Sequence, residues 1–143
     1  MRYDGCILKI TRDANMLYIL YTAVILVLVG CDQLLKSWTV HHLELGQSAA
    51  FLPGFMQLTR VHNYGAAWSS LSGKTVLLLA VTAVLMVGVA VLLLKKIVRH
   101  PLGITAALLI LGGGVGNIID RIAHGYVVDM FDLLLFDYPV FNL

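Results

Sequence analysis

Residues 102–121 read LGITAALLILGGGVGNIIDR. The first eighteen of them, Leu102 to Ile119, carry no charge, and the stretch ends on Asp120 and Arg121. A helix that crosses the hydrocarbon core of a bilayer needs about 20 mostly apolar residues, with a range of roughly 17–25. A surface helix of a soluble protein would show a polar face, and this stretch has none. It therefore predicts a membrane-spanning helix that ends in an aspartate.

The rest of the chain has the same character. Two further long segments are uncharged, Ala14 to Cys31 and Thr75 to Leu94. Of the 143 residues, 59% are hydrophobic and 13% are charged, whereas a soluble domain carries about 25% charge. We therefore expect a single all-α membrane domain with three transmembrane helices, over about residues 14–31, 75–94 and 102–119.

Lysine and arginine set the expected orientation, because they concentrate in cytoplasmic loops. They gather before the first span and between the second and third: Arg2, Lys9, Arg12, Lys95, Lys96 and Arg99. The segment 32–74 is poorer in them and should form an external loop. Within it, Pro53-Gly54 marks a turn, and the mixed polar and apolar residues of Phe55 to His62 predict a short strand. This orientation delivers Asp120 near the outer face.

Polar residues at the ends of the spans are the candidates for a site. Asn117 and Asp120 are three residues apart and share one helical face, and an ionisable residue in a membrane span indicates function by default. The alternative is an interfacial carboxylate paired with Arg121. Gly112 and Gly116 have the spacing that lets helices approach closely in lipid.

Two other groups are ambiguous when taken alone. Asp32 and Lys36 are spaced as an i, i+4 ion pair, which fits either a site or a simple charge pair at a helix end. Asn63, in VHNYGAAW, has an amide that can both donate and accept, but it is equally suited to a turn. After Asp120 the chain is interrupted too often by aspartates to form a further span.

Taken together and in order, these motifs resemble the bacterial lipoprotein signal peptidase family. The matching pieces extend from about Leu17 to the last residue: DQLLK (32–36), VHNYGAAW (61–68), GGGVGNIIDR (112–121), GYVVDMF (125–131) and PVFN (139–142). The resemblance implies four membrane helices, three of them present here, and a small external β-cradle. It also implies an aspartic endopeptidase of the bacterial cytoplasmic membrane that removes signal peptides from prolipoproteins bearing a diacylglyceryl cysteine.

The resemblance also implies the partners. These are prolipoprotein substrates and membrane lipid, and the chain is expected to be a monomer. No nucleic-acid partner is expected, because the net charge is only +2 and the sequence shows no basic patch with interleaved aromatic residues. No metal or organic cofactor is expected, since the five histidines and two cysteines show no ligand spacing.

The family's catalytic pair of aspartates implies roles for individual residues. Asp120 matches the first member. The motif that holds the second begins at Phe141-Asn142-Leu143, so this aspartate would fall two positions beyond the C-terminus. Asn117 and Arg121 are expected to shape the surroundings of the pair. Residues expected to bind substrate or support the site are Asp32, Lys36, Asn63, Gly65, Asn117, Arg121, Asp129 and Asn142. Asp132 and Asp137 match no catalytic position and are expected to be solvated loop charges.

Peptide hydrolysis by carboxylates needs one to activate water and a protonated partner to polarise the carbonyl. A polypeptide with Asp120 alone is therefore expected to be inactive. Without a fourth helix, the glycines of GGGVG are expected to face lipid without close partners, and Asp120 to lack a protein wall.

The N-terminus allows other readings. Residues 1–15 show no family match and are expected to be a dispensable cytoplasmic extension, or untranslated if synthesis starts at Met16, with residues 16–143 as the peptidase domain. Leu28 to Cys31 resembles a lipobox, which would make the product a lipoprotein. A non-catalytic binding or assembly protein of the same fold is the remaining alternative.

Overall fold

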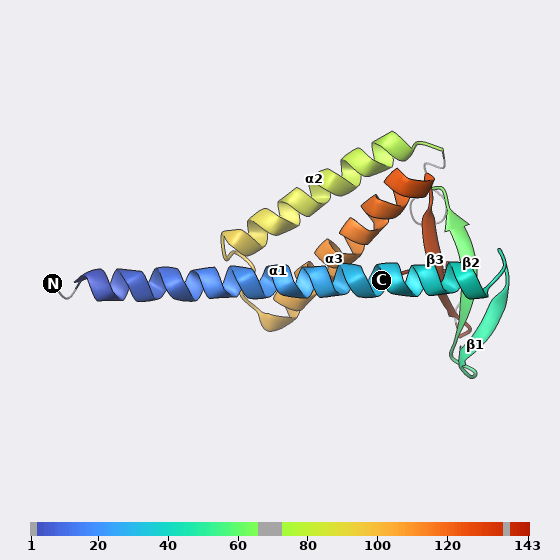
Figure 1. Cartoon of the computed structure of the whole chain (residues 1–143), viewed down its shortest axis with the longest axis horizontal. Coiled ribbons are helices and arrows are strands. Elements are labelled where there is room, and N and C mark those ends of the chain that lie inside the picture. Colours follow the sequence, from blue (N-terminus) through green and yellow to red (C-terminus); the bar gives the residue numbers. More distant parts are fainter. Residues whose placement is uncertain (1–2, 66–72, 136–137) are drawn as a thin grey trace.

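The computed structural model describes residues 3–65, 73–135 and 138–143, and for residues 3–14 only the backbone. Three long helices lie beside one another, and a small sheet crosses one end of α1 (Figure 1). In chain order the elements are α1 Tyr3–His42, β1 Ser48–Leu52, β2 Met56–Asn63, α2 Thr75–Leu94, α3 Pro101–His124 and β3 Val127–Leu133.

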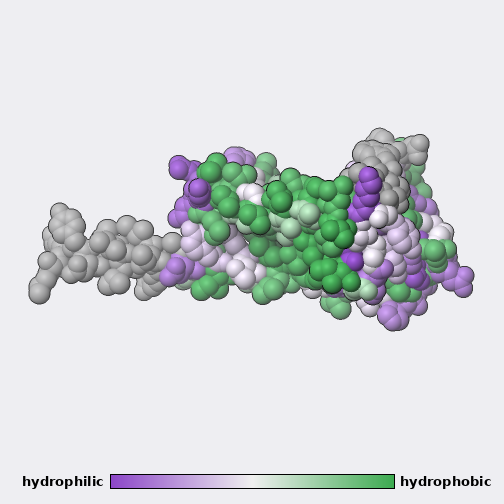
Figure 2. All heavy atoms as spheres, turned by 90° about the horizontal axis from the view of Figure 1, so that it is seen from above, coloured by the Kyte–Doolittle hydropathy of each residue, from purple (hydrophilic) through white to green (hydrophobic). Residues whose placement is uncertain are grey.

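The helices have the surface of a membrane protein. Three segments are long and apolar enough to span a bilayer: Asn15–His42, Thr75–Leu94 and Pro101–His124. Their large apolar side chains point outward, as at Leu20, Val84 and Ile122. Figure 2 shows a hydrophobic band across the middle of the molecule, with hydrophilic residues at both ends. The expected all-α membrane fold with a small β-structure is therefore confirmed.

The ends of two helices differ from the expected spans. α1 continues through Cys31 and Asp32 to His42, so the loop expected from residue 32 begins eleven residues later. α3 likewise extends past Ile119 to His124. In both places a charged residue marks the predicted end of the span, but Asp32 and Asp120 lie where α1 and α3 contact each other, so the helices continue past them. α2 has the predicted bounds, and α3 begins at Pro101, one residue before the predicted span.

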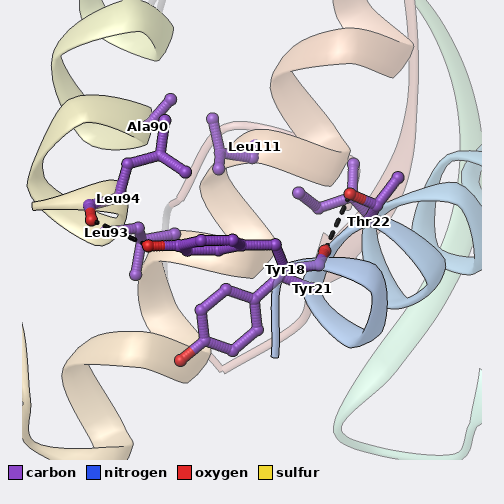
Figure 3. Close-up of a pocket in the computed structure, with 8 residues that line it drawn as sticks. Tyr18, Tyr21, Thr22, Ala90, Leu93, Leu94 and Leu111 are labelled. Carbon is purple, nitrogen blue, oxygen red and sulfur yellow. Dashed lines mark hydrogen bonds between the residues drawn. The ribbon is translucent and has the colours of Figure 1, made fainter. Parts of the chain in front are cut away.

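An apolar core joins the three helices. Leu93 of α2 and Ala107, Leu108 and Leu111 of α3 are buried, and side chains of α1 such as Ile25 pack against them. A shallow pocket remains beside this core (Figure 3). There the Tyr18 hydroxyl group donates to the backbone oxygen of Leu94 at 3.3 Å. Because this pocket is lined by apolar groups, tyrosines and a threonine, it offers no acid or base of the kind that peptide hydrolysis needs.

The glycines of α3 are covered, which corrects the expectation that they would face lipid. A Cβ added to Gly112 would lie 2.6 Å from Cβ of Leu28 in α1, and one added to Gly116 would overlap Asp32. Gly114 lies against Met86 of α2, and Gly113 against the backbone of Leu143. Small residues allow this approach; α1, α2 and the chain end occupy the faces that we had expected to be open.

The sheet is antiparallel, with β2 between β1 and β3. The predicted turn at Pro53-Gly54 joins β1 to β2, with Gly54 in the left-handed region at φ 75°. Gly125, also left-handed, ends α3 and leads the chain into β3. The Nη1 group of Arg60 donates to the backbone oxygens of Val40 and Leu43, each at 3.0 Å, and so fastens β2 to the end of α1.

Candidate active site

Asp120 lies on the face of α3 that packs against α1. Lys36 projects from α1 so that its Nζ lies 3.0 Å from Oδ2 of Asp120 and 2.8 Å from Oδ2 of Asp32. The same ammonium donates to Oδ1 of Asn117 at 3.0 Å. One ammonium group thus contacts two carboxylates and an amide. These contacts join residues of α1 to residues of α3 that stand 81 or more positions further along the sequence.

Gln33 joins the same group. Its Nε2 donates to Oδ1 of Asp120 at 3.0 Å, to Oδ2 of Asp32 at 3.2 Å and to the backbone oxygen of Gly116 at 3.3 Å. The backbone N–H of Val128, at the start of β3, donates to Oδ2 of Asp120 at 3.1 Å. Both carboxylate oxygens of Asp120 are therefore held. We call Asp32, Gln33, Lys36, Asn117 and Asp120 the polar cluster.

The polar cluster is enclosed. Asp32 is 0% exposed, and Lys36 and Asp120 are each 3% exposed. The expectation that Asp120 would lack a protein wall is therefore wrong, because α1 covers it on one side and β3 on another. Removing charges from water is costly unless they are paired and hydrogen-bonded, and here each charge has a partner of opposite sign.

A small hollow leads to Asp120 from the end of the helices. It is lined by residues of α1, α3 and β3, among them Gln33, Lys36, Val40, Asp120, His124 and Val128. Asp32 does not line it. The two carboxylates of the polar cluster therefore differ in access: a reacting group could reach Asp120 through this hollow, whereas Asp32 faces only protein.

A second polar group surrounds Asp129 of β3. Asn63 Nδ2 donates to Oδ2 of Asp129 at 2.8 Å, and the amide of Asn142 donates to its other oxygen. Burial raises the pKa of Asp129, and the two amide donors oppose that rise. Asn63 also accepts from the backbone N–H of Gly65 at 2.9 Å. These residues brace β3 against β2 and the chain end.

Arg121 and Gly65 connect the two groups. Arg121 follows Asp120 in α3, and its Nη2 donates to the backbone oxygen of Gly65 at 2.9 Å. Because Gly65 is itself bonded to Asn63, the end of α3 and the end of β2 are tied together. All eight residues expected to support the site therefore lie in these two linked groups; the structure assigns them positions, and their roles in the reaction stay predictions.

The remaining aspartates were expected to be solvated loop charges. That expectation is wrong for Asp132, which lies within β3 and accepts from Gln57 Nε2 at 2.7 Å and Thr59 Oγ1 at 2.9 Å. Pairing of β3 with β2 places Gln57 opposite Asp132. Asp137 lies outside the described residues.

Two contributors to the site were not predicted. The sequence analysis assigns no role to Gln33 of DQLLK, although its spacing of three from Lys36 places both residues on one helical face. The donor at Val128 is a backbone group, and no side-chain pattern could have indicated it. Among the described residues, no group of three or more histidine, cysteine or acidic side chains could hold a metal ion.

This geometry defines a class of protein: a helical membrane protein with an aspartate that is enclosed by the helices and lines a small hollow. Comparison with known proteins gives the family. A family model described as signal peptidase (SPase) II matches residues 24–143. The lipoprotein signal peptidase of Enterococcus faecalis is 38% identical over 130 residues, covering 89% of this chain and 79% of that protein. For the enzyme of Streptococcus pneumoniae the values are 39% over 121 residues, 84% and 78%.

Solved structures agree. A bacterial membrane enzyme determined by the in meso method at 2.3 Å resolution has a TM-score of 0.77 and 30% identity, covering 85% of this chain and 76% of that one. A second, at 1.9 Å, has a TM-score of 0.73 and 30% identity. The chain belongs to the signal peptidase II family of lipoprotein signal peptidases, which are aspartic proteases. The resemblance read from the motifs is confirmed, and with it a membrane location and prolipoprotein substrates as the family's substrate class.

Proposed function

We propose that Asp120 is a catalytic aspartate of this chain. The observation that carries the proposal is the difference in access within the polar cluster: Asp120 is held through both oxygens and still lines a hollow. Preorganised groups around a reacting carboxylate need no rearrangement when charge develops in the reaction. Lys36, Gln33 and the Val128 N–H then act by orienting Asp120, and Asp32 acts by holding Lys36.

The proposed reaction is cleavage of a prolipoprotein signal peptide before a diacylglyceryl cysteine. The hollow opens at the end of the apolar spans, where a lipid-modified cysteine in the bilayer surface could reach it. From the distribution of lysine and arginine we place this end at the outer face of the bacterial cytoplasmic membrane. We further propose that the chain acts as a monomer.

The chemistry requires a second carboxylate beside the first. Among the described residues, Asp32 is enclosed, Asp129 is bonded to Asn63 and Asn142, and Asp132 is bonded to strand β2. None of them lines the hollow next to Asp120. We therefore expect a polypeptide of residues 1–143 alone to be inactive, and one that is extended by the family's Ala-Asp step and a fourth apolar span to be active.

The test compares these two polypeptides on a diacylglyceryl-modified prolipoprotein in liposomes. Only the extended chain should release the signal peptide, and Asp120→Asn should lower its rate by at least about 10²–10⁴-fold. Asp132→Asn is the matched control, because it changes a half-buried, hydrogen-bonded aspartate outside the hollow. Cleavage by residues 1–143 that survives Asp120→Asn would refute the proposal.

A further inference from the structure

An apolar surface lies at one end of the sheet, away from the polar cluster. β1 ends at Leu52, β2 begins just after Phe55, and β3 is followed by Leu134. The N–H of Phe55 donates to the oxygen of Leu52 at 3.0 Å, and the N–H of Leu134 donates to the oxygen of Phe55 at 2.9 Å. The side chains of the hairpin-end patch are between 44% and 58% exposed: Phe51, Leu52, Phe55, Leu134 and Leu135.

In the part of the chain that the structure describes, few charged residues stand near the hairpin-end patch in the sequence. The sequence has no charged residue between Glu44 and Arg60. The charge nearest along β3, Asp132, is bonded to Gln57 and Thr59. Soluble surfaces rarely leave several large apolar side chains open at one place, and where they do, the site marks contact with a protein, a ligand or a membrane.

The position of the sheet favours contact with a membrane over contact with a protein or a ligand. Asp32 packs against Gly116, and Lys36 against Asp120, so α1 and α3 are in register. Four residues beyond each of the latter pair are Val40 and His124, which therefore lie at about the same level near the ends of the two spans. Because Arg60 bonds the oxygen of Val40, the sheet is fixed at that level.

Two further features place a bilayer surface there. Trp38 of α1 is 44% exposed and stacks on His42, with ring centroids 4.6 Å apart, and exposed tryptophans are typical of membrane interfaces. In Figure 1 the strands run across the axis of α1, and the hairpin end reaches past α1 on the side away from α2. The hairpin end therefore lies beside the end of α1, at the level where the apolar spans end.

We propose that the hairpin-end patch is a membrane contact, with its aromatic and leucine side chains inserted into the interface of the leaflet where α1 and α3 end. The sheet is then held at one end by the bond from Arg60 to the end of α1 and at the hairpin end by the bilayer. This proposal concerns the surface of the chain and stands whether or not Asp120 is catalytic.

The test places a single tryptophan in the patch. The full chain, with Trp38→Phe and Trp68→Phe, receives Phe55→Trp and is reconstituted into phospholipid liposomes whose acyl chains are brominated near the headgroups. Phe51→Trp provides an independent second reporter. The matched control is Leu45→Trp: Leu45 is 63% exposed but lies next to Glu44, in the segment between α1 and β1, at the other end of β1.

Bromolipid should quench both patch tryptophans several-fold more strongly than the tryptophan at position 45, and should do so unchanged when the protein is diluted in lipid. Equal quenching at the patch and at position 45 would overturn the proposal. So would patch tryptophans that bromolipid does not quench but that are shielded from aqueous iodide only at high protein density, because a second copy of the chain would then be the occupant.

Discussion

The contact between α1 and α3 differs in its two halves. In the N-terminal half, Leu28 packs on Gly112 and apolar side chains such as Leu111 fill the space beside them. In the C-terminal half, one turn further along each helix, Asp32 packs on Gly116, and Lys36 lies between two carboxylates. The geometry of close approach is the same in both halves, and only the chemistry of the contacting side chains changes.

The two halves show that close packing brings the helices together, whereas the charged side chains form the candidate site. Lipid is as apolar as leucine, so the N-terminal half is stabilised by close packing rather than by a hydrophobic driving force. In the C-terminal half the same packing encloses charges. Because an enclosed charge without a partner is costly, the stability of the folded chain there depends on every charge keeping its partner. A substitution should therefore cost packing energy in one half and charge balance in the other.

The largest effect is expected where charge balance is lost. Lys36→Met keeps an apolar stem of similar length but leaves Asp32 and Asp120 facing each other without a cation. Breaking a buried ion pair on one side costs about 3–5 kcal/mol. The free energy of unfolding, measured by SDS titration in mixed micelles, should fall by that amount. A loss as small as that of an exposed lysine such as Lys95→Met would show that the cluster is solvated.

The glycine pair should give an intermediate effect of two kinds. Gly112→Ala and Gly116→Ala each add a methyl group to a filled contact, and overpacking typically costs about 1–3 kcal/mol. Both should lower stability in the same titration. In the extended chain, which we expect to be active, only Gly116→Ala should also lower the cleavage rate, because its methyl group displaces Asp32 and with it Lys36. Equal activity of the two variants would break the distinction between the halves.

The smallest effect is expected outside the spans, at Asp129. Burial raises the pKa of this carboxyl above its ordinary value of 3.8. The folded state therefore keeps the proton to higher pH than the unfolded state, and the free energy of unfolding falls as pH rises through the window between the two pKa values. Asn63→Ala removes a donor to the ionised form, so it should raise the pKa further and widen that window.

Carboxyl NMR titration of Asp129, with and without Asn63→Ala, would measure the shift. Gln57→Ala, which removes a donor from Asp132 instead, is the control and should leave Asp129 unchanged. A lower pKa of Asp129 in Asn63→Ala would contradict the assigned hydrogen bond.

The sequence predicted some of these elements better than others, for physical reasons. Length and hydropathy were enough to predict the bounds of α2 and to place the start of α3 within one residue, because lipid imposes this constraint locally. The absence of charge, used as the criterion for a span, ended the first predicted span too early, before Asp32. The sequence does not distinguish a charge that is paired between two helices from a charge in water. Of the strands, the turn signal at Pro53-Gly54 indicated β2, whereas β1 and β3 depend on pairing that no local pattern shows.

In the site, too, individual residues could be predicted from the sequence, whereas the contacts between them could not. Asp120, Asn117, Asp32 and Lys36 could be named from spacing and from motifs. Their convergence on one ammonium could not, because it depends on the register that Gly112 and Gly116 set between two helices. The covering of the glycines themselves was predicted wrongly for this reason.

The central claim is that Lys36 forms ion pairs with both carboxylates of the polar cluster. A double-mutant cycle on Asp32 and Lys36 tests it most directly. The free energy of unfolding would be measured for the unaltered chain, Asp32→Asn, Lys36→Met and the double variant. We predict that Asp32→Asn partly rescues Lys36→Met, so that the double variant is more stable than Lys36→Met alone. The interaction free energy should then fall within the range of about 0.5–3 kcal/mol seen for contacting residues. Additive losses would show that the two side chains do not interact and would contradict the account.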